Sequence, residues 1–266
     1  MDAIELLQTP PLWAVRGLPQ HGRAHLGLCD GGVMDGWDLQ QANALLGNAP
    51  GAAALELVAG PLRLRASRDL LVMQAGARFE LRIDGRLQPE RLVRRVPQGA
   101  ELRLDGPLAG QYGLLAVDGG ITSQEGFALR LGAARPVRPR GLHAAVPSLP
   151  LALLPGPEFA LLDAPSRAAL WRAGWVLEPG SNRIGLRLKG PMLDCAAPEL
   201  LSHAVQPGLV QLPPGGQPIV LGAGAAASGG YPRIGQVAAC DLWKLAHFRP
   251  GSVLRFAPID LDSARA

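Results

Sequence analysis

The chain has 266 residues, of which 48% are hydrophobic and 18% charged, and this excludes a disordered protein because such a chain can bury a core. The net charge of +4 comes from arginines that are scattered singly along the chain. With only two Tyr and five Phe, the chain has no group of aromatic side chains on which bases could stack, so nucleic-acid binding is not expected. No apolar run of about 18 residues and no basic leader followed by an apolar stretch is present, so we expect a soluble, cytoplasmic protein without membrane contact.

Short strands are the elements that the sequence predicts most often. The 34 glycines and 25 prolines indicate many turns, and several segments alternate apolar and polar residues, as half-buried strands do. In chain order, the expected strands are Leu62–Ala66, Phe79–Ile83, Glu101–Leu104, Leu114–Val117, Gly185–Lys189, Ile219–Leu221 and Val253–Phe256. Asp84-Gly85 and Asp105-Gly106 each follow such a run and predict hairpin turns.

Three short helices are expected. Asp38 is suited to cap the first, which ends at Gly47. The second spans Pro165–Ala173, with the proline in its first turn. The third begins near Asp241 and stops before Pro250.

The stretch from Arg135 to Pro150 carries four prolines and no periodicity, which favours a domain boundary there. We therefore expect an N-terminal β-rich domain over residues 1–140 and a C-terminal β-barrel domain over residues 141–266. The predicted class is mostly β, with two barrel-like domains of antiparallel strands and a few short helices.

The segment Gln217–Ile234, QPIVLGAGAAASGGYPRI, has two interpretations. Gly222, Gly224 and Ala227 match the G-x-G-x-x-A pattern of dinucleotide-binding loops, which requires a helix to follow at once. Two adjacent glycines and Pro232 follow instead, and these residues disfavour a helix. The favoured interpretation is a strand that leads through a loop of small residues into a second strand.

A metal site and a reactive thiol were considered near the N-terminus. His21, His25, Cys29 and Asp30 cluster in sequence, but glycines argue against a helix there and no compact C-x-x-C pair is present, so no metal is predicted. Cys29 beside Asp30 suggests a reactive thiol, yet a buried structural cysteine is favoured. Three widely spaced cysteines indicate a reducing compartment rather than a disulfide framework.

Two pairs of charged residues leave their interpretations open. Asp30 and Asp35 flank two glycines and are suited either to acid–base chemistry or to a plain acidic turn. Arg183 and Arg187 are four residues apart, so on an extended strand both would face one side and could bind an anion. Two surface arginines are the alternative for this pair.

Taken in order, several motifs resemble one family. They are HGRAHLGLCDGGVMDGWDLQQANALLGN (His21–Asn48), AALEL (Ala53–Leu57), VDGGI (Val117–Ile121), LPGP (Leu154–Pro157), SNRIGLRLKG (Ser181–Gly190), PGLVQLPPGGQPIVL (Pro207–Leu221) and SGGYPRI (Ser228–Ile234). The ordered series resembles the biotin-dependent carboxyltransferase family, which includes the C subunit of 5-oxoprolinase, allophanate hydrolase subunit 2 and the Kip-type antagonist. The resemblance covers nearly the whole chain.

The resemblance implies two β-rich domains, the second cyclophilin-like, and the C subunit of an ATP-dependent 5-oxoprolinase that opens a lactam to glutamate. It implies as partners the A and B subunits of that 5-oxoprolinase, of which the B protein is Kip-inhibitor-like. No cofactor is expected on this chain alone, because it lacks G-x-x-x-x-G-K-[ST], so ATP would be bound through the partner subunits. Two alternatives are a carboxyltransferase module that acts on urea or a similar amide from carboxybiotin, and a non-catalytic partner-binding protein of the same fold.

The site residues carried over are two catalytic candidates and five substrate-binding candidates: Asp35 and His203, then Arg183, Arg187, Gln217, Ser228 and Tyr231. The chain also departs from the family pattern. Gly224, Ala226 and Ala227 stand where the family tends to have Asp, Gln and Thr, and His203 stands where a Glu is typical. These departures imply an intact fold whose active site is altered or lost.

Overall fold

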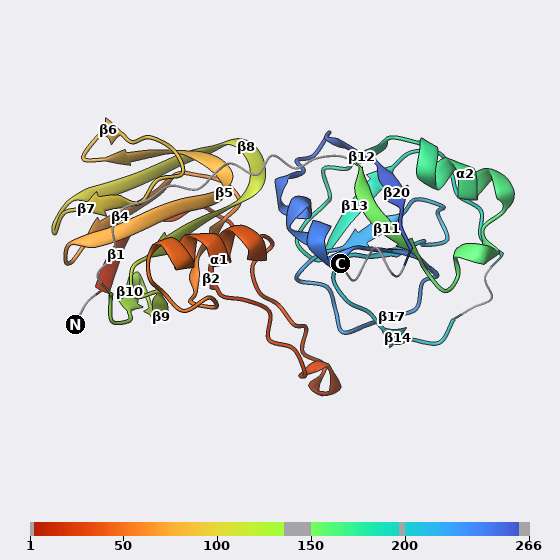
Figure 1. The fold of residues 1–266 in the computed structure, drawn as a ribbon, viewed down its shortest axis with the longest axis horizontal. Coiled ribbons are helices and arrows are strands. Elements are labelled where there is room, and N and C mark those ends of the chain that lie inside the picture. Colours follow the sequence, from red (N-terminus) through yellow and green to blue (C-terminus); the bar gives the residue numbers. More distant parts are fainter. Residues whose placement is uncertain (1–2, 136–149, 197–199, 261–266) are drawn as a thin grey trace. The chain divides into compact units, whose positions relative to one another are not determined.

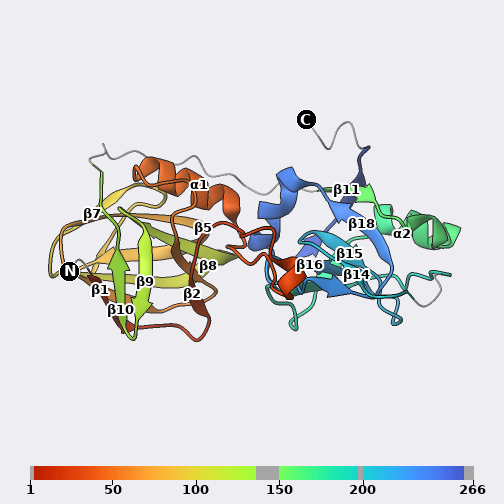
Figure 2. The ribbon, with the colours of Figure 1, turned by 90° about the horizontal axis from the view of Figure 1, so that it is seen from below.

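The computed structural model describes residues 3–135, 150–196 and 200–260. The chain divides into two compact units (Figures 1 and 2): the first comprises Met1–Leu18 and Asp35–Val146, and the second comprises Pro19–Met34 and Pro147–Ala266. The predicted domain boundary between residues 140 and 141 lies outside the described residues. The sequence did not predict that Pro19–Met34 would group with the second unit.

In the part of the chain that the structure describes, the first unit has ten strands and one helix. These are β1 (Ala3–Gln8), β2 (Trp13–Arg16), α1 (Gly36–Leu45), β3 (Ala54–Leu57), β4 (Leu62–Ala66), β5 (Leu70–Ile83), β6 (Arg86–Leu87), β7 (Arg94–Val96), β8 (Glu101–Val117), β9 (Ile121–Glu125) and β10 (Ala128–Leu131).

The strands of the first unit form one sheet that curls back on itself. Its order is β2-β3-β8-β4-β1-β10-β9, and β5 pairs with β8 and carries β6 and β7. A bridge between Ala53, just before β3, and Ile121 in β9 brings the far end of the sheet back towards its start. Alternate residues such as Leu62, Leu64, Leu102 and Leu104 are fully buried, so the core fills the inside of the curved sheet.

The two aspartate–glycine turn signals had different outcomes. Asp84 and Gly85 both have positive φ and join β5 to β6 in a tight hairpin, as predicted. Asp105-Gly106 makes no hairpin: Asp105 pairs with Glu80 of β5, and the two strands predicted on either side of this dipeptide are one long strand, β8. The extensive ladder with β5 overrides the local turn preference.

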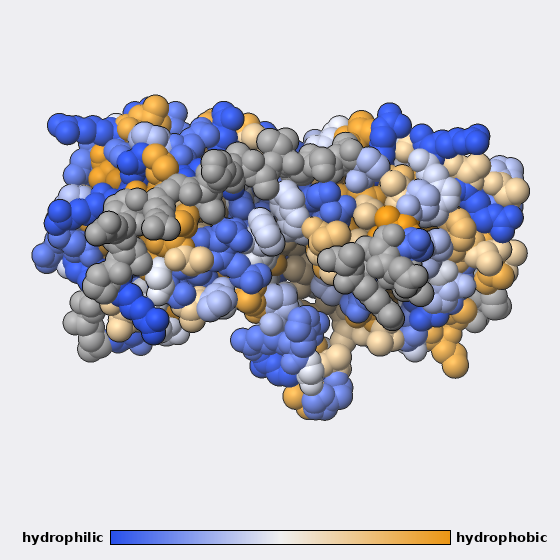
Figure 3. All heavy atoms as spheres, in the orientation of Figure 1, coloured by the Kyte–Doolittle hydropathy of each residue, from blue (hydrophilic) through white to orange (hydrophobic). Residues whose placement is uncertain are grey.

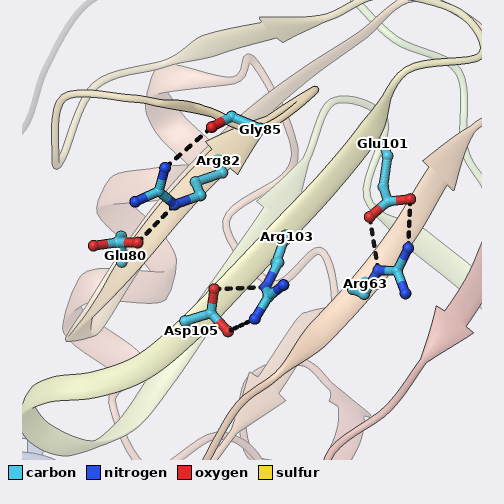
Figure 4. A network of polar contacts seen from close by, with 7 residues as sticks. All are labelled: Arg63, Glu80, Arg82, Gly85, Glu101, Arg103 and Asp105. Atoms are coloured by element: carbon cyan, nitrogen blue, oxygen red, sulfur yellow. Dashed lines mark hydrogen bonds and ion pairs between the residues drawn. The ribbon is translucent and has the colours of Figure 1, made fainter.

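Arginines and carboxylates cover part of the outer face of this sheet. Arg63 of β4, Arg103 of β8 and Arg82 of β5 lie directly opposite one another in the ladders, an arrangement of like charges that is unfavourable by itself. Figure 4 shows how each is compensated, because the three bind Glu101, Asp105 and Glu80 respectively, each with a shortest distance of 2.7 Å.

The second unit contains shorter strands. Its described elements are η1 (Ala24–Leu26), β11 (Leu151–Pro155), η2 (Phe159–Leu161), α2 (Ala164–Arg172), β12 (Trp175–Leu177), β13 (Gly185–Lys189), β14 (His203–Ala204), β15 (Leu209–Gln211), β16 (Ile219–Leu221), β17 (Ser228–Gly229), β18 (Arg233–Val237), η3 (Ala239–His247), β19 (Val253–Leu254) and β20 (Phe256–Pro258), where η denotes a 3₁₀ helix.

The topology of the second sheet requires it to be almost closed. Its order is β19-β12-β13-β16-β15-β18-β11-β20, so the two outermost strands are β19 and β20. Only Arg255 separates these strands along the chain, and the two edges of the sheet must therefore meet. The mostly β class with two barrel-like sheets is thus confirmed, whereas the cyclophilin-like character of the second domain stays a prediction.

The predicted helices are present, with one changed cap. The Asp35 carboxylate, not that of Asp38, caps α1 by accepting the backbone N–H of Asp38 at 2.8 Å, so the helix starts one turn earlier than predicted. α2 matches the second prediction, and the third predicted helix forms as η3.

No helix in the described ranges has the length and apolarity needed to cross a membrane. On the face drawn in Figure 3, hydrophobic residues are interspersed with hydrophilic ones.

Asp38 instead attaches α1 to the sheet. It is 2% exposed, and its carboxylate accepts the backbone N–H of Gly76 in β5 at 2.8 Å and a guanidinium N–H of Arg91 at 3.0 Å. These two hydrogen bonds are strong because they go to an ionised carboxylate that is shielded from water, and one of the donors is itself charged.

Removing this carboxylate should destabilise the first unit. We expect Asp38→Ala to lower the free energy of unfolding by about 2–4 kcal/mol, because it leaves a buried guanidinium and a backbone N–H without an acceptor. Urea denaturation measures the change. Gln40→Ala, on the exposed side of the same helix, is the matched control and should change stability by less than about 0.5 kcal/mol. Equal effects of the two substitutions would contradict the attachment role.

Candidate functional site

His203 and Ser228 lie on the two strands of a short ladder of the second unit, and because side chains alternate along a strand, the two project from opposite faces of it. β14 and β17 lie side by side (Figure 1), with His203 opposite Gly229 and Ala204 opposite Ser228. Nδ1 of His203 lies 3.2 Å from the carbonyl oxygen of Leu201. Because a carbonyl oxygen only accepts, Nδ1 donates this bond, and Nε2 of the neutral ring is left as the proton acceptor. Ser228 is exposed at the surface of the ladder.

A partly buried ion pair lies close to this histidine. Arg233 of β18 binds Glu158 through Nη2 at 2.7 Å, Nε at 2.9 Å and its backbone N–H at 2.8 Å. The hydrogen bonds from Arg233 hold the pKa of the Glu158 carboxyl below its usual value, and the positive charge that His203 can carry makes a smaller contribution in the same direction. Glu158 therefore remains ionised near neutral pH.

The sequence analysis missed this ion pair. Glu158 directly follows the LPGP motif, and Arg233 belongs to SGGYPRI, but both motifs were noted for their glycines and prolines. Gln211 of β15, which lies opposite Arg233, was missed in the same way within PGLVQL. The sequence signal for the ion pair was a charged residue at the edge of each motif, Glu158 after LPGP and Arg233 within SGGYPRI.

Tyr231 lines a cavity of about 580 Å³ in the second unit. Three leucines and three prolines are among its lining residues, together with Asp194, Cys195 and Tyr231.

Arg183 has a structural role. Its guanidinium donates to the carbonyl oxygen of Gly32, and this bond attaches the Pro19–Met34 segment to the rest of the second unit. Its carbonyl oxygen accepts the N–H of Gly224 at 2.9 Å, and a Cβ at Gly224 would lie 2.9 Å from Arg183 Nε. The Arg183 side chain therefore fills the space beside the position where the family tends to carry Asp.

The structure does not bring Arg183 and Arg187 onto one strand. Arg183 precedes β13, so the alternation expected of an extended strand does not apply to the pair, whereas Arg187 lies within β13 and is exposed. The Gln217 side chain accepts the N–H of Gly190 at 2.8 Å and donates to its carbonyl oxygen at 3.2 Å. Gln217 thus joins two backbone segments.

Asp35 lies in the first unit, whereas the other six predicted site residues lie in the second. It is fully buried at the start of α1, where it acts as the helix cap. Its catalytic role stays a prediction.

The four residues considered as metal ligands do not converge in the structure. His21 Nδ1 and Asp30 Oδ2 lie 2.7 Å apart, whereas His25 and Cys29 are exposed. The prediction of a buried structural cysteine at position 29 was therefore wrong, because the segment that carries it is exposed. Within the described ranges, none of the four belongs to a group of three or more close potential ligands.

The glycine-rich loop does not fit a nucleotide phosphate. β16 leads through a turn to β17 and then to β18, so a second strand and not a helix follows the loop, as predicted. The N–H groups and dipole of a helix N-terminus, which bind a pyrophosphate in dinucleotide folds, are missing at this position.

Comparison with known proteins gives a consistent result. A family model for the carboxyltransferase domain, subdomain A and B, matches residues 26–130 and 124–258. The C subunit of 5-oxoprolinase from Haemophilus influenzae is 32% identical over 98% of this chain and 93% of its own length.

Two solved structures share the fold. The crystal structure of TTHA0988 has a TM-score of 0.87 at 31% identity over 97% of this chain, which spans about half (55%) of that protein. The Kluyveromyces lactis urea carboxylase has a TM-score of 0.87 over 99% of this chain and 28% of its own length, and at 20% identity the likeness concerns the fold alone. The chain therefore belongs to the carboxyltransferase domain family, subdomains A and B.

The Glu158–Arg233 pair should contribute stability that depends on pH. We expect Glu158→Gln to lower the free energy of unfolding at pH 7 by about 1–3 kcal/mol, since Arg233 loses its charged acceptor. Because the folded-state pKa of Glu158 is lowered, this contribution is fully present above the unfolded value of about 4.3 and is lost as the pH falls through the folded value.

Chemical denaturation of both proteins at pH 7 and at acidic pH tests the pair. The difference in unfolding free energy between wild type and variant should narrow on acidification. Glu178→Gln, at a partly exposed glutamate of the same unit, serves as control and should stay within about 0.5 kcal/mol of wild type at both pH values. A constant difference would mean that Glu158 acts through packing alone.

Loss of the Arg183 bond should loosen the Pro19–Met34 segment. We expect Arg183→Ala to raise the rate of trypsin cleavage after Arg23 about tenfold, because one charge-assisted hydrogen bond holding the segment closed is lost. Mass spectrometry of the fragments measures the rate. Arg187→Ala removes an exposed arginine from the same region and should leave that rate unchanged, and identical rates in the two variants would refute the attachment.

Proposed function

We propose that this chain is the C subunit of an ATP-dependent 5-oxoprolinase, which opens the lactam of 5-oxoproline to glutamate together with the A and B subunits. The near end-to-end match with the Haemophilus influenzae protein of that name carries the proposal, because the similarity extends over 98% of this chain and 93% of that protein. ATP would be bound by the partner subunits, since the glycine-rich loop of this chain does not fit a nucleotide. A cytoplasmic hetero-oligomeric hydrolase is part of the same proposal.

The second unit offers groups suited to this chemistry. Opening a lactam adds water to the carbonyl carbon, breaks the C–N bond and leaves the proton of the water on the nitrogen. Neutral His203, with Nε2 as acceptor, can take a proton from the attacking water and return it to the nitrogen. In the proposal, Arg187 binds the substrate carboxylate and Tyr231 donates a hydrogen bond, while Arg183 and Gln217 hold backbone groups of the second unit.

A non-catalytic, partner-binding role is the second candidate. It is favoured by one observation: the side chains of Asp35, Arg183 and Gln217 hold backbone groups in this structure, and Gly224, Ala226 and Ala227 provide no polar side chain in the neighbouring loop. A carboxyltransferase module acting on urea or a similar amide from carboxybiotin is the third, which the family supports only at its coarser level.

The deciding experiment measures ATP-dependent glutamate release from 5-oxoproline. The chain is co-purified with its A and B partners, and a preparation without it serves as reference. We expect activity only when this chain is present, and a kcat about 10²–10⁴ lower for His203→Ala, because general acid–base catalysis contributes that much.

His25→Ala, which changes an exposed histidine, is the matched control and should keep full activity. A stable complex without activity would favour the partner-binding role. Activity that needs biotin and bicarbonate in place of 5-oxoproline would favour the carboxyltransferase module.

A further inference from the structure

Two buried nitrogens of the second unit have no hydrogen-bond partner among the described residues. They are Nε2 of His203 and the side-chain amide nitrogen of Gln211, which is 6% exposed overall. An unpaired buried polar group destabilises a protein by roughly 1–3 kcal/mol, so two of them close together point to a ligand that pairs with both.

The ladder geometry places the two nitrogens on the same side of β14–β17. His203 lies directly opposite Gly229, and directly opposite residues of an antiparallel pair project to the same face. A Cβ at Gly229 would lie 2.8 Å from the Gln211 amide nitrogen, so the Gln211 side chain lies against that same face. Gly229 itself has no side chain to separate the amide from the imidazole, and Val205 is the other side chain beside this position, with Cγ1 3.3 Å from where a Cβ would lie.

The two nitrogens have opposite hydrogen-bonding roles. His203 donates from Nδ1 to the Leu201 carbonyl, so Nε2 accepts, whereas the Gln211 amide nitrogen can only donate. A complementary ligand must present a donor and an acceptor on one edge. An amide held in the cis configuration by a ring does so, because its N–H and C=O lie on the same side, whereas a trans amide points them in opposite directions.

We propose that His203 Nε2 and the Gln211 amide form a recognition pair for a lactam in the complex before reaction: the lactam N–H donates to His203, and its carbonyl accepts from Gln211. Because Nε2 has a single lone pair, it exchanges the lactam N–H for the attacking water before it takes the water proton. The choice of a lactam over other cyclic amides rests on the proposed function, whereas the pairing of donor and acceptor rests on the geometry alone. Gln211 thereby becomes a specificity-determining residue that the sequence did not reveal.

The surroundings hold Gln211 in place. On its β18 side, Gln211 lies opposite Arg233, whose position is fixed by Glu158. The 580 Å³ cavity begins one residue further along the chain from Gln211 and Gly229, where Leu212 and Gly230 line it.

Nuclear magnetic resonance of the full chain tests the pair directly. The probe is 2-pyrrolidinone, a lactam without a carboxylate, and N-methyl-2-pyrrolidinone is the matched probe that lacks the N–H. We expect 2-pyrrolidinone to shift the Gln211 side-chain amide and His203 ring signals saturably. The N-methyl compound should bind about tenfold more weakly, because it leaves His203 Nε2 without a donor.

Two variants separate the pair from the neighbouring cavity. Gly229→Ala should weaken lactam binding about tenfold by displacing the flexible end of Gln211, a substitution that the backbone tolerates because Gly229 is not among the positive-φ glycines. Gln211→Leu should have a similar effect. Gly215→Ala is the control, since a Cβ there meets nothing within 4 Å, and it should bind as wild type.

Several outcomes overturn the inference: no saturable shift, equal binding of the two probes, wild-type binding by Gly229→Ala, or shifts confined to Tyr231 and the cavity. The proposed function is judged separately. Glutamate release with an unchanged KM for Gln211→Leu would support the proposed function and refute the recognition pair. Lactam binding that depends on the lactam N–H, without glutamate release by the complex, would support the recognition pair and refute the proposed function.

Discussion

Pairing of short strands with their neighbours is the constraint on which both units depend. Strands of two to five residues, as in the second unit, are not stable alone and gain their stability from the neighbours that satisfy their backbone groups. There β19 and β20 occupy opposite edges, one bonded to β12 and the other to β11, and Arg255 joins them. Loops must then pass very close to strands. At Gly156 a Cβ would lie 2.1 Å from the carbonyl oxygen of Arg233, so only glycine fits.

The sequence predicted those parts of the fold that depend on local pattern. β4, β13 and β16 were predicted with their observed bounds, since alternation and short apolar runs report burial directly. Asp105-Gly106 was misjudged because its turn preference competes with a ladder to β5, a partner that is distant in sequence. The grouping of Pro19–Met34 with the second unit was likewise inaccessible, because it depends on contacts such as the one between Arg183 and Gly32.

The same distinction applies to the candidate site. His203 and Ser228 were both predicted, and the structure pairs their strands. Glu158, Arg233 and Gln211 were missed because their importance lies in the register of β15 with β18 and in the approach of Glu158, neither of which a single motif encodes. Polar residues that look available in sequence, such as Gln217, turn out to hold backbone groups. The proposed recognition pair accordingly rests on unmet hydrogen-bonding capacity, which the structure shows at His203 and Gln211 and which no motif reports.

The division of the chain into units also sets an order for its synthesis. Pro19–Met34 leaves the ribosome before most of the first unit, yet it belongs to a unit whose sheet is completed only by β19 and β20. All strands of the first unit are available long before that, so this unit can form its core while the rest is still being translated. Pro19–Met34 can therefore make its contacts with the second unit only after the later strands of that unit have been synthesised. Pausing of translation between the two units would consequently lengthen the time for which Pro19–Met34 stays exposed to proteases and chaperones.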